Sequence, residues 1–246
     1  MTQFDELAEI YEEFSRLPFR RELEFPSVLG VLGDLSGLRV LDLGCGSGVY
    51  SRTLARCGAG RVVGLDDSGG MIEHARVRES AEPLGVSYVG GPLPAALAGG
   101  FDVVLGVYVL PYATTYAELT GLCRTAADAL RPGGRFVTLP IHPGVHHDPG
   151  HYERYGFRLT TGRSPEDGSS VDLELRFAAY ETHVTARYWS ATTLERALRE
   201  TGFGPVRWRP HRLSPSAAAG PPDFWQPYLS TPHAAILDTR KEESPS

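Results

Sequence analysis

The sequence predicts an α/β fold built on a doubly wound, mostly parallel β-sheet. Between residues 39 and 141, short and nearly continuous apolar runs alternate with helical segments, as expected for strands that are covered on both faces. The first of these strands runs into a glycine-rich turn and then into a helix. Because strand-helix-strand units repeat along this stretch, the strands are expected to lie parallel, with ligands bound beyond their carboxyl ends.

Residues 1–38 are expected to form a helical N-terminal lead, or lid. Apolar side chains recur there at three- and four-residue spacing, which is typical of one helix face: Phe4, Leu7, Ile10, Tyr11 and Phe14. Pro18 should end this helix, and a second short helix is expected from about residue 27 to residue 32.

Residues 39–141 are expected to hold the ligand-binding core. The predicted strands are 39–43, 61–65, 86–89, 102–107 and 134–141, and the predicted helices between them are 50–57, 68–82 and 116–130. Two closing strands, at about 206–209 and 233–239, bring the sheet to seven strands. The last of the three helices should end at the sequence Arg131-Pro-Gly-Gly134.

Residues 142–189 interrupt this pattern and predict an antiparallel insert. Apolar residues alternate with charged ones from Val171 to Phe177, which is the period of a half-exposed strand, and residues 156–161 are its expected partner. Residues 190–240 should add a helix over 190–201, a long loop containing Pro221, Pro222, Phe224 and Trp225, and the closing strands. We expect one domain over residues 1–240 and a disordered tail over 241–246.

Composition narrows the function before any motif is considered. The 246 residues carry 24 basic and 30 acidic side chains, a formal charge of −6, which argues against a general nucleic-acid-binding surface. The acidic N-terminus lacks the pattern of a secretory signal, and no apolar run is long enough for a membrane span. Three widely separated cysteines suit a reducing compartment, so a cytoplasmic location is expected.

The most informative motif is the glycine-rich turn after the first strand. It reads Asp42-Leu-Gly44-Cys45-Gly46-Ser-Gly48, and Val49 stands where a dinucleotide-binding Gly-x-Gly-x-x-Gly pattern needs glycine. Glycines let a backbone approach a ligand closely, and the helix that follows offers free amides to an anionic group. The second strand ends on Asp66-Asp67, where a carboxylate can accept hydrogen bonds from two ribose hydroxyls.

This acidic-x-Gly-x-Gly-x-Gly motif resembles that of the class I S-adenosylmethionine-dependent methyltransferases. The resemblance covers residues 39–141 most clearly and includes Leu130-Arg-Pro-Gly-Gly134 before the fifth strand. It implies a seven-stranded Rossmann-like methyltransferase sheet and S-adenosyl-L-methionine as the cofactor. The chain departs from many members in having no acidic residue after the third strand, so adenine recognition is expected to depend on backbone groups near Gly91 and on packing.

The resemblance also implies which residues hold the cofactor. Asp66 would bind the ribose, Met71 would cover the adenine, and Tyr11 and Arg20 would close over the cofactor carboxylate, although a packed tyrosine and a solvated arginine remain the alternative. The full set of expected cofactor-binding residues is Tyr11, Arg20, Asp42, Gly44, Cys45, Gly46, Gly48, Asp66, Asp67, Met71, Gly91 and Val107.

The methyl acceptor is expected beyond the fourth and fifth strands. His142 is the candidate base because imidazole titrates near neutral pH, with a structural histidine as the alternative. Aromatic residues of the insert suit a flat, partly apolar acceptor. The candidate substrate residues are Tyr108, Tyr112, Phe157, Glu181, His183 and Trp189. No metal site is assigned, although four histidines lie between residues 142 and 151.

The aromatic segments after the core resemble bacterial methyltransferases of secondary metabolism, including the toxoflavin type, which methylate nitrogen heterocycles. The expected function is therefore methyl transfer to an oxygen or ring nitrogen of a small aromatic or heterocyclic metabolite, by a monomer or homodimer. Two alternatives remain at this point. One is a protein or RNA methyltransferase, which needs a basic groove, and the other is a non-catalytic cofactor-binding module.

Overall fold

The structure is a computed structural model that describes residues 8–177 and 180–243. Its main sheet, within these residues, has seven strands in the order β3-β2-β1-β4-β5-β10-β9. The strands are β1 (Arg39–Leu43), β2 (Arg61–Asp66), β3 (Ser87–Gly90), β4 (Phe101–Val107), β5 (Leu130–Leu139), β9 (Arg207–Arg209) and β10 (Ile236–Arg240). The first five run parallel, and β10 is antiparallel to both neighbours. The predicted doubly wound, mostly parallel sheet is confirmed.

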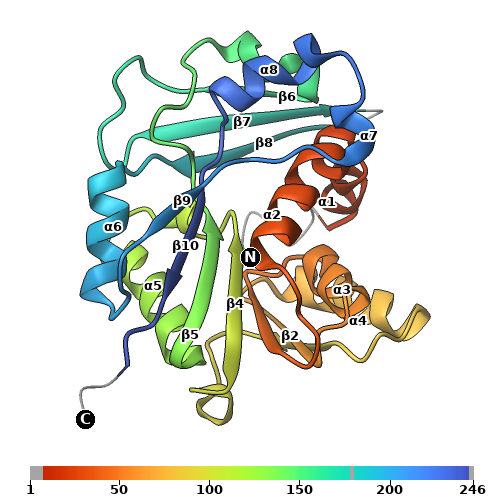
Figure 1. The fold of residues 1–246 in the computed structure, drawn as a ribbon, viewed down its shortest axis with the longest axis vertical. Coiled ribbons are helices and arrows are strands. Elements are labelled where there is room, and N and C mark those ends of the chain that lie inside the picture. Colours follow the sequence, from red (N-terminus) through yellow and green to blue (C-terminus); the bar gives the residue numbers. More distant parts are fainter. Residues whose placement is uncertain (1–7, 178–179, 244–246) are drawn as a thin grey trace.

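Helices cover both faces of this sheet because the strand side chains alternate between them. Leu41 and Leu43 pack in one apolar cluster with α5 (Tyr116–Ala129) and α6 (Ala191–Glu200). Val40, on the opposite face, packs in a second cluster with α2 (Phe25–Leu32), α3 (Val49–Arg56) and α4 (Gly69–Ala81). Figure 1 shows the two groups of helices on either side of the strands. Short 3₁₀ turns at Ala95–Leu97 (η2) and Leu110–Tyr112 (η3) flank β4.

The N-terminal lead is helical, as predicted, but its second helix is longer than the sequence indicated. After α1 (Ala8–Ser15), a π-helical turn, η1 (Arg20–Glu24), leads directly into α2. Phe4 and Leu7, which belong to the predicted first helix, lie outside the described residues. Pro26 lies in the first turn of α2 and has no N–H to donate to the preceding π turn, where the carbonyl of Glu22 instead accepts the N–H of Ser214. The unbroken run places Arg20 and Glu24 one turn apart.

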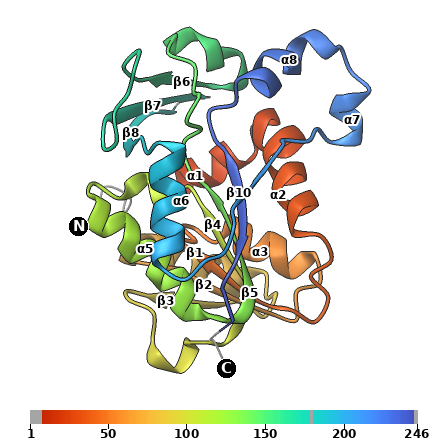
Figure 2. The same ribbon diagram turned by 60° about the vertical axis from the view of Figure 1, so that its left-hand side comes forward.

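The insert forms a second, three-stranded sheet, here called the cover sheet. It consists of β6 (Phe157–Thr160), β7 (Ser170–Phe177) and β8 (Tyr180–Arg187), and it follows the 3₁₀ segment η4 (Pro149–Tyr155). Phe157 pairs with Leu175, so the predicted pairing of β6 with β7 is correct, while β8 was not predicted. Figures 1 and 2 both show the cover sheet across the end of the seven-stranded sheet where β4 and β5 finish.

Near the C-terminus the structure differs from the sequence prediction in the segment expected to be a long loop. The expected long loop contains the helices α7 (Pro215–Ala218) and α8 (Pro222–Ser230), because proline starts each helix and Trp225 and Tyr228 are buried one turn apart in α8. Lys241, the first residue of the expected disordered tail, donates from its Nζ to the carbonyls of Ala127 and Leu130, while residues 244–246 lie outside the described residues and the tail stays a prediction. Within the described residues, no helix is long and apolar enough to cross a bilayer.

Candidate active site

The glycine-rich loop after β1 has a conformation that requires its glycines. Gly44, Gly46 and Gly48 all have positive φ angles, of 65°, 53° and 81°. A Cβ at Gly44 would lie 2.4 Å from a methyl carbon of Val109, and one at Gly48 would lie 2.4 Å from the Tyr88 hydroxyl. Any side chain at either position would therefore clash as well as strain the backbone. One side of the loop therefore packs closely against Val109 and Tyr88, and its other side lines the cavity described below.

Two carboxylates hold this loop in place. Asp66 Oδ2 accepts the N–H of Gly46 at 2.8 Å, and Asp66 Oδ1 accepts the N–H of Ser68 at 2.8 Å. Since a carboxylate offers about four lone-pair positions, one aspartate can hold both segments. Asp42 is buried beneath the loop and accepts the Ser51 hydroxyl at 2.6 Å. Burial, and to a lesser extent the nearby charge of Asp66, raise the pKa of Asp42 to about 7.

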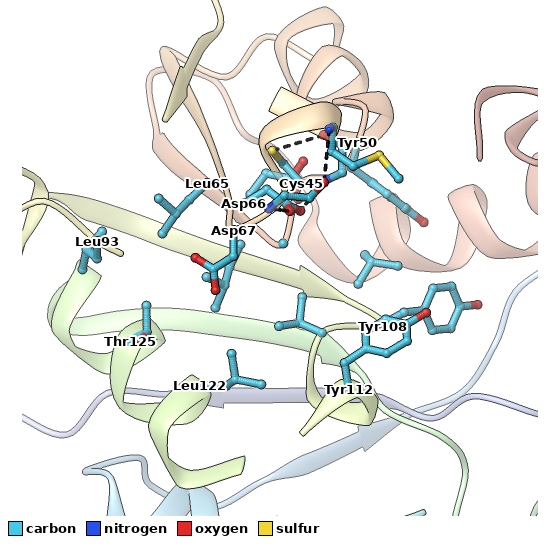
Figure 3. Close-up of a pocket in the computed structure, with 18 of the residues that line it drawn as sticks. Cys45, Tyr50, Leu65, Asp66, Asp67, Leu93, Tyr108, Tyr112, Leu122 and Thr125 are labelled. Atoms are coloured by element: carbon cyan, nitrogen blue, oxygen red, sulfur yellow. Dashed lines mark hydrogen bonds between the residues drawn. The ribbon is translucent and has the colours of Figure 1, made fainter. Parts of the chain in front are cut away.

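A cleft of about 720 Å³ runs past this loop along the carboxyl ends of the parallel strands. Ten of the expected cofactor-binding residues line it: Arg20, Asp42, Gly44, Cys45, Gly46, Asp66, Asp67, Met71, Gly91 and Val107. Figure 3 shows Leu93 and Thr125 toward one end of the cleft and Tyr108 and Tyr112 toward the other. The tertiary structure therefore brings together residues from the N-terminal lead, the loops after β1 to β4, and α5.

Several lining residues were missed by the sequence analysis. Leu122 and Thr125 on α5 face the cleft. Leu93 lines it too, within the segment 91–93 whose backbone was expected to contact the adenine. The spacing of the α5 residues by three or four positions fits one helix face, but the same spacing also fits ordinary core packing. The spacing of these residues therefore predicts that they share a helix face, but it does not show whether that face binds a ligand or packs in the core.

A buried ion pair closes one end of the cleft. Arg20 Nε lies 2.7 Å from Glu24 Oε1, and both side chains are less than 10% exposed. The guanidinium also lies within 6 Å of four ring centroids, those of Phe14, Phe25, Tyr50 and Tyr108. Glu24 in turn accepts the hydroxyls of Tyr50 at 2.8 Å and Tyr108 at 2.5 Å. The sequence analysis did not select Glu24. Its position four residues after Arg20 is the spacing at which oppositely charged side chains pair on a helix.

A second, smaller cavity lies between the strand ends and the cover sheet, and we call it the chamber. Its lining is mostly apolar and comes from both layers: Phe14, Arg20, Tyr108, Pro111, Tyr112, Ile141, Phe157, Leu159, Val171, Leu173, Leu175, Val184, Ala186 and His233. Arg20, Tyr108 and Tyr112 line the cleft as well, so they form the boundary between the two cavities. The chamber holds about 40 Å³, so a larger ligand requires the cover sheet or the ring side chains to move.

Comparison with known proteins identifies the family. A profile described as "Methyltransferase domain" matches residues 40–134. A ubiquinone biosynthesis O-methyltransferase from Cereibacter sphaeroides strain KD131 is 34% identical over 189 residues, which cover 74% of this chain and 67% of the relative. This chain belongs to the class I S-adenosylmethionine-dependent methyltransferases. A relative of the same name from Ruegeria pomeroyi is 30% identical over 185 residues, covering 74% of this methyltransferase and 66% of the relative.

The chain matches less than two thirds of the length of some of these relatives. The matched segments span 66% of the Ruegeria relative and 43% of another relative of the same name from Methylobacterium sp. strain 4-46. Among solved structures, an S-adenosylmethionine-dependent methyltransferase from Mesorhizobium loti has a TM-score of 0.61 and 24% sequence identity, with 89% of this chain and 97% of that chain covered. That likeness supports the Rossmann-like methyltransferase fold with the added antiparallel sheet.

The cleft fits S-adenosylmethionine, the cofactor of this family. The glycines leave space above the loop, since a Cβ built at Gly46 meets only the Met71 sulfur, at 3.9 Å, and one at Gly91 meets nothing within 4 Å. The chemistry of the lining matches a zwitterion at one end and a flat ring at the other, with cationic Arg20 at the first and Leu93 and Leu122 at the second. Figure 3 shows Asp66 between Leu93 and Tyr108, where a ribose would need a carboxylate.

The structure does not bring every expected cofactor residue to the cleft. Gly48 lies behind the loop against Tyr88 and does not line the cleft, so its contribution is to the loop conformation. The side chain of Tyr11 lies outside the described part of the chain, and its role stays a prediction.

Among the expected substrate residues, Tyr108, Tyr112 and Phe157 line the chamber, whereas His183 and Trp189 line neither cavity. His183 is exposed on β8, and its neighbour Val184 lines the chamber. Because adjacent residues of a strand point to opposite faces, His183 points away from the chamber. Trp189 is buried in the apolar cluster below α5 and α6. The side chain of Glu181 lies outside the described residues.

Of the histidines, the structure places His233 rather than His142 at the chamber. His142 lies outside the lining of both cavities, and its Nδ1 accepts the N–H of Gly144 at 2.9 Å. Partial burial, and then the neighbouring His211, lower the pKa of His142. His233 is buried between Tyr108 and Tyr228, and the sequence analysis missed it because it precedes β10, almost one hundred residues later in the chain.

The other histidines after β5 stack on one another. The ring centroids of His146 and His151 are 4.0 Å apart and nearly parallel, and His147 stacks on His146 at 5.2 Å. Within residues 8–177 and 180–243, no group of three or more metal-ligating side chains is arranged to hold an ion.

The pKa of Asp42 gives a pH prediction for stability. In the unfolded chain Asp42 titrates near 3.8, and in the folded chain near 7, so the folded state binds more protons between these values and stability falls as the pH rises through this window. Asp42→Asn keeps an acceptor for Ser51 without the charge, so this variant should lose less stability between pH 4 and pH 7. Urea unfolding at several pH values measures this difference, and parallel pH profiles for the two proteins would contradict it.

Proposed function

We propose that this methyltransferase transfers a methyl group from S-adenosylmethionine to a hydroxyl group of a small, largely apolar aromatic acceptor. The observation that carries the proposal is the chamber, whose apolar lining ends on Arg20, Tyr108 and Tyr112 at the boundary with the cofactor cleft. Pockets of this kind bind a ring through apolar contacts and orient it through a few polar groups. Within the chamber lining, the charged side chain is Arg20, which is already paired with Glu24.

The chain's part in the reaction is mainly positioning. The bound cofactor supplies a methyl group on a positively charged sulfur. The glycine loop, Asp66 and Arg20 would fix the cofactor, while the chamber walls would hold the acceptor oxygen in line and keep water out. Holding two reactants in a reactive geometry can supply much of the rate acceleration. The small volume of the chamber is consistent with an acceptor enclosed after the cover sheet closes over it.

An oxygen acceptor is favoured over a ring nitrogen by the names of the relatives, which are O-methyltransferases. The loose likeness to toxoflavin-type enzymes keeps a ring nitrogen as part of the proposal, with a role in secondary metabolism. Acidic net charge and an apolar chamber support a small-molecule acceptor.

The experiment is methyl transfer by the purified chain from labelled S-adenosylmethionine to a panel of phenols, catechols and aromatic nitrogen heterocycles, with products identified by mass spectrometry. We expect methyl ethers of the phenolic members. Because Phe157 reaches the chamber from the cover sheet, Phe157→Arg should abolish transfer while leaving binding of S-adenosylhomocysteine unchanged. Methylation only of nitrogen would contradict the hydroxyl as the acceptor group, and equal rates in the Phe157 variant would contradict the chamber as the acceptor site.

A further inference from the structure

A chain of hydrogen bonds crosses the boundary between the cleft and the chamber. The Tyr108 hydroxyl donates to Glu24 Oε2 at 2.5 Å and lies 3.2 Å from His233 Nε2. His233 Nδ1 lies 2.7 Å from the hydroxyl of Tyr228. The residues come from three distant parts of the sequence, with Tyr228 and His233 five positions apart, and they meet where an acceptor would face the cofactor. Of these residues, Tyr108 was expected at the acceptor, whereas Glu24, His233 and Tyr228 had no expected role.

The direction of each hydrogen bond follows from the donors available. A carboxylate only accepts, so the single proton of the Tyr108 hydroxyl is used by Glu24. His233 must then donate its Nε2–H to the Tyr108 oxygen, and its unprotonated Nδ1 accepts from Tyr228. Burial lowers the pKa of His233 well below its ordinary value, which agrees with a neutral ring. A phenolic oxygen has two acceptor positions, so one position on Tyr108 remains for a ligand.

The backbone at Tyr108 supports a functional role by an independent observation. Tyr108 has a φ angle of 57°, and among the described residues it is the one non-glycine with a positive φ. A bulky residue in this region is strained, and such strain persists where surrounding structure or function requires it. Here it turns the ring directly after β4 so that Tyr108 lines both cavities.

We propose that Tyr108 accepts first the hydrogen bond and then the proton of the acceptor hydroxyl, with Glu24 as the final proton acceptor and His233 as a positioning residue. The inference rests on the proposed O-methylation. The acceptor O–H bond breaks and its proton moves to the Tyr108 oxygen, while the proton of Tyr108 moves to Glu24 Oε2. The electron pair of the O–H bond stays on the acceptor oxygen and forms the bond to the methyl carbon, and the pair of the broken methyl–sulfur bond stays on sulfur.

This route also gives the site its selectivity. With its own proton used by Glu24, Tyr108 can accept but not donate a hydrogen bond to the acceptor. It therefore selects a group that carries a proton, such as a phenolic hydroxyl, over the methyl ether that the reaction makes. A site built for one hydrogen-bonding pattern rejects an analogue that lacks it. Release of the methylated product follows from the same contact.

The first arm of the experiment measures binding without turnover. Phenol and its methyl ether, anisole, are titrated into the protein loaded with S-adenosylhomocysteine, and ligand-observed NMR gives both affinities. The wild type should prefer phenol by about tenfold, the value of one hydrogen bond, and Tyr108→Phe should bind the two equally. Tyr116→Phe is the matched control, because the Tyr116 hydroxyl bonds Glu200 on the surface of α5 and α6, outside both cavities.

The second arm measures transfer to the phenolic acceptors of the panel. Tyr108→Phe and Glu24→Gln should each lower kcat by about 100-fold, the range of general base catalysis, with less than threefold change in KM for the acceptor in Glu24→Gln. Calorimetry with S-adenosylhomocysteine shows that each variant is folded and binds cofactor. Glu24→Gln keeps the size of the side chain but leaves the buried Arg20 without its anionic partner, so unchanged affinity for S-adenosylhomocysteine is the evidence that Arg20 stays in place and that the kcat of this variant reports on the proton acceptor.

Retention of the phenol preference by Tyr108→Phe, or of full kcat by Glu24→Gln, would overturn the inference. A kcat loss in His142→Ala equal to that in Glu24→Gln would overturn it as well, because it would restore His142 as the base. The wild type could also methylate no oxygen and still show a preference for phenol that depends on Tyr108. That result would disprove the proposed reaction and the proton transfer, but it would support the hydrogen bond to Tyr108. These results separate failure of the inference from failure of the proposed function.

Discussion

Asp66→Ala should weaken binding of S-adenosylmethionine by about 100-fold, the equivalent of about 3 kcal/mol. Two losses add in this variant. The carboxylate that would accept the ribose hydroxyls is removed, and the N–H of Gly46 loses the partner that holds the glycine loop at 2.8 Å. Isothermal titration calorimetry with the cofactor and with S-adenosylhomocysteine measures the effect.

Neighbouring variants separate these contributions. Asp66→Asn keeps an oxygen that can accept the Gly46 N–H but removes the charge, so its affinity should fall between those of the wild type and Asp66→Ala. Asp128→Ala removes an exposed carboxylate on α5 outside both cavities and should bind the cofactor like the wild type. Wild-type affinity in Asp66→Ala would disprove the ribose assignment.

Arg20→Ala should destabilise the folded chain by about 3–5 kcal/mol, because it leaves the buried carboxylate of Glu24 without its cationic partner. The loss is large since both side chains are almost fully covered and the guanidinium also fills a space between aromatic rings. Urea unfolding at neutral pH, followed by circular dichroism, measures the change.

A double variant tests the cause of that loss. Arg20→Ala with Glu24→Gln removes the uncompensated charge, so it should be more stable than Arg20→Ala alone even though it lacks one more charged group. Arg16→Ala is the matched control, because Arg16 pairs with Glu13 at the surface and exposed pairs contribute at most about 1 kcal/mol. Equal stability losses at positions 16 and 20 would mean that the buried pair has no special role.

The sequence alone predicted those parts of the structure that depend on local patterns. The first strand was predicted with its observed bounds, Arg39–Leu43, and α5 to within one residue. The glycine motif also predicted where the cleft would lie, since Gly44 and Gly46 both line it. These predictions succeed because side-chain periodicity and the freedom of glycine act over a few neighbouring residues.

The acceptor side of the site was predicted less well. His142 follows β5, as its position in the sequence indicated, but the chain turns after Ile141 and leaves its ring outside both cavities. His183 was chosen for its chemistry, and a shift of a single residue along β8 decides that Val184 faces the chamber instead. Local patterns place an element, but they do not say which of its faces meets a cavity formed by other elements.

The sequence by itself determined the family, the cofactor and the seven-stranded sheet, because a contiguous motif and repeated strand-helix units specify them. Only the tertiary structure decided the polar boundary of the chamber. Glu24 lies 84 positions before Tyr108, and His233 lies 125 positions after it, yet both reach the same hydroxyl. The physical reason is burial: a carboxylate, a phenol and an imidazole removed from water must satisfy one another, and folding brings such partners together from any distance along the chain.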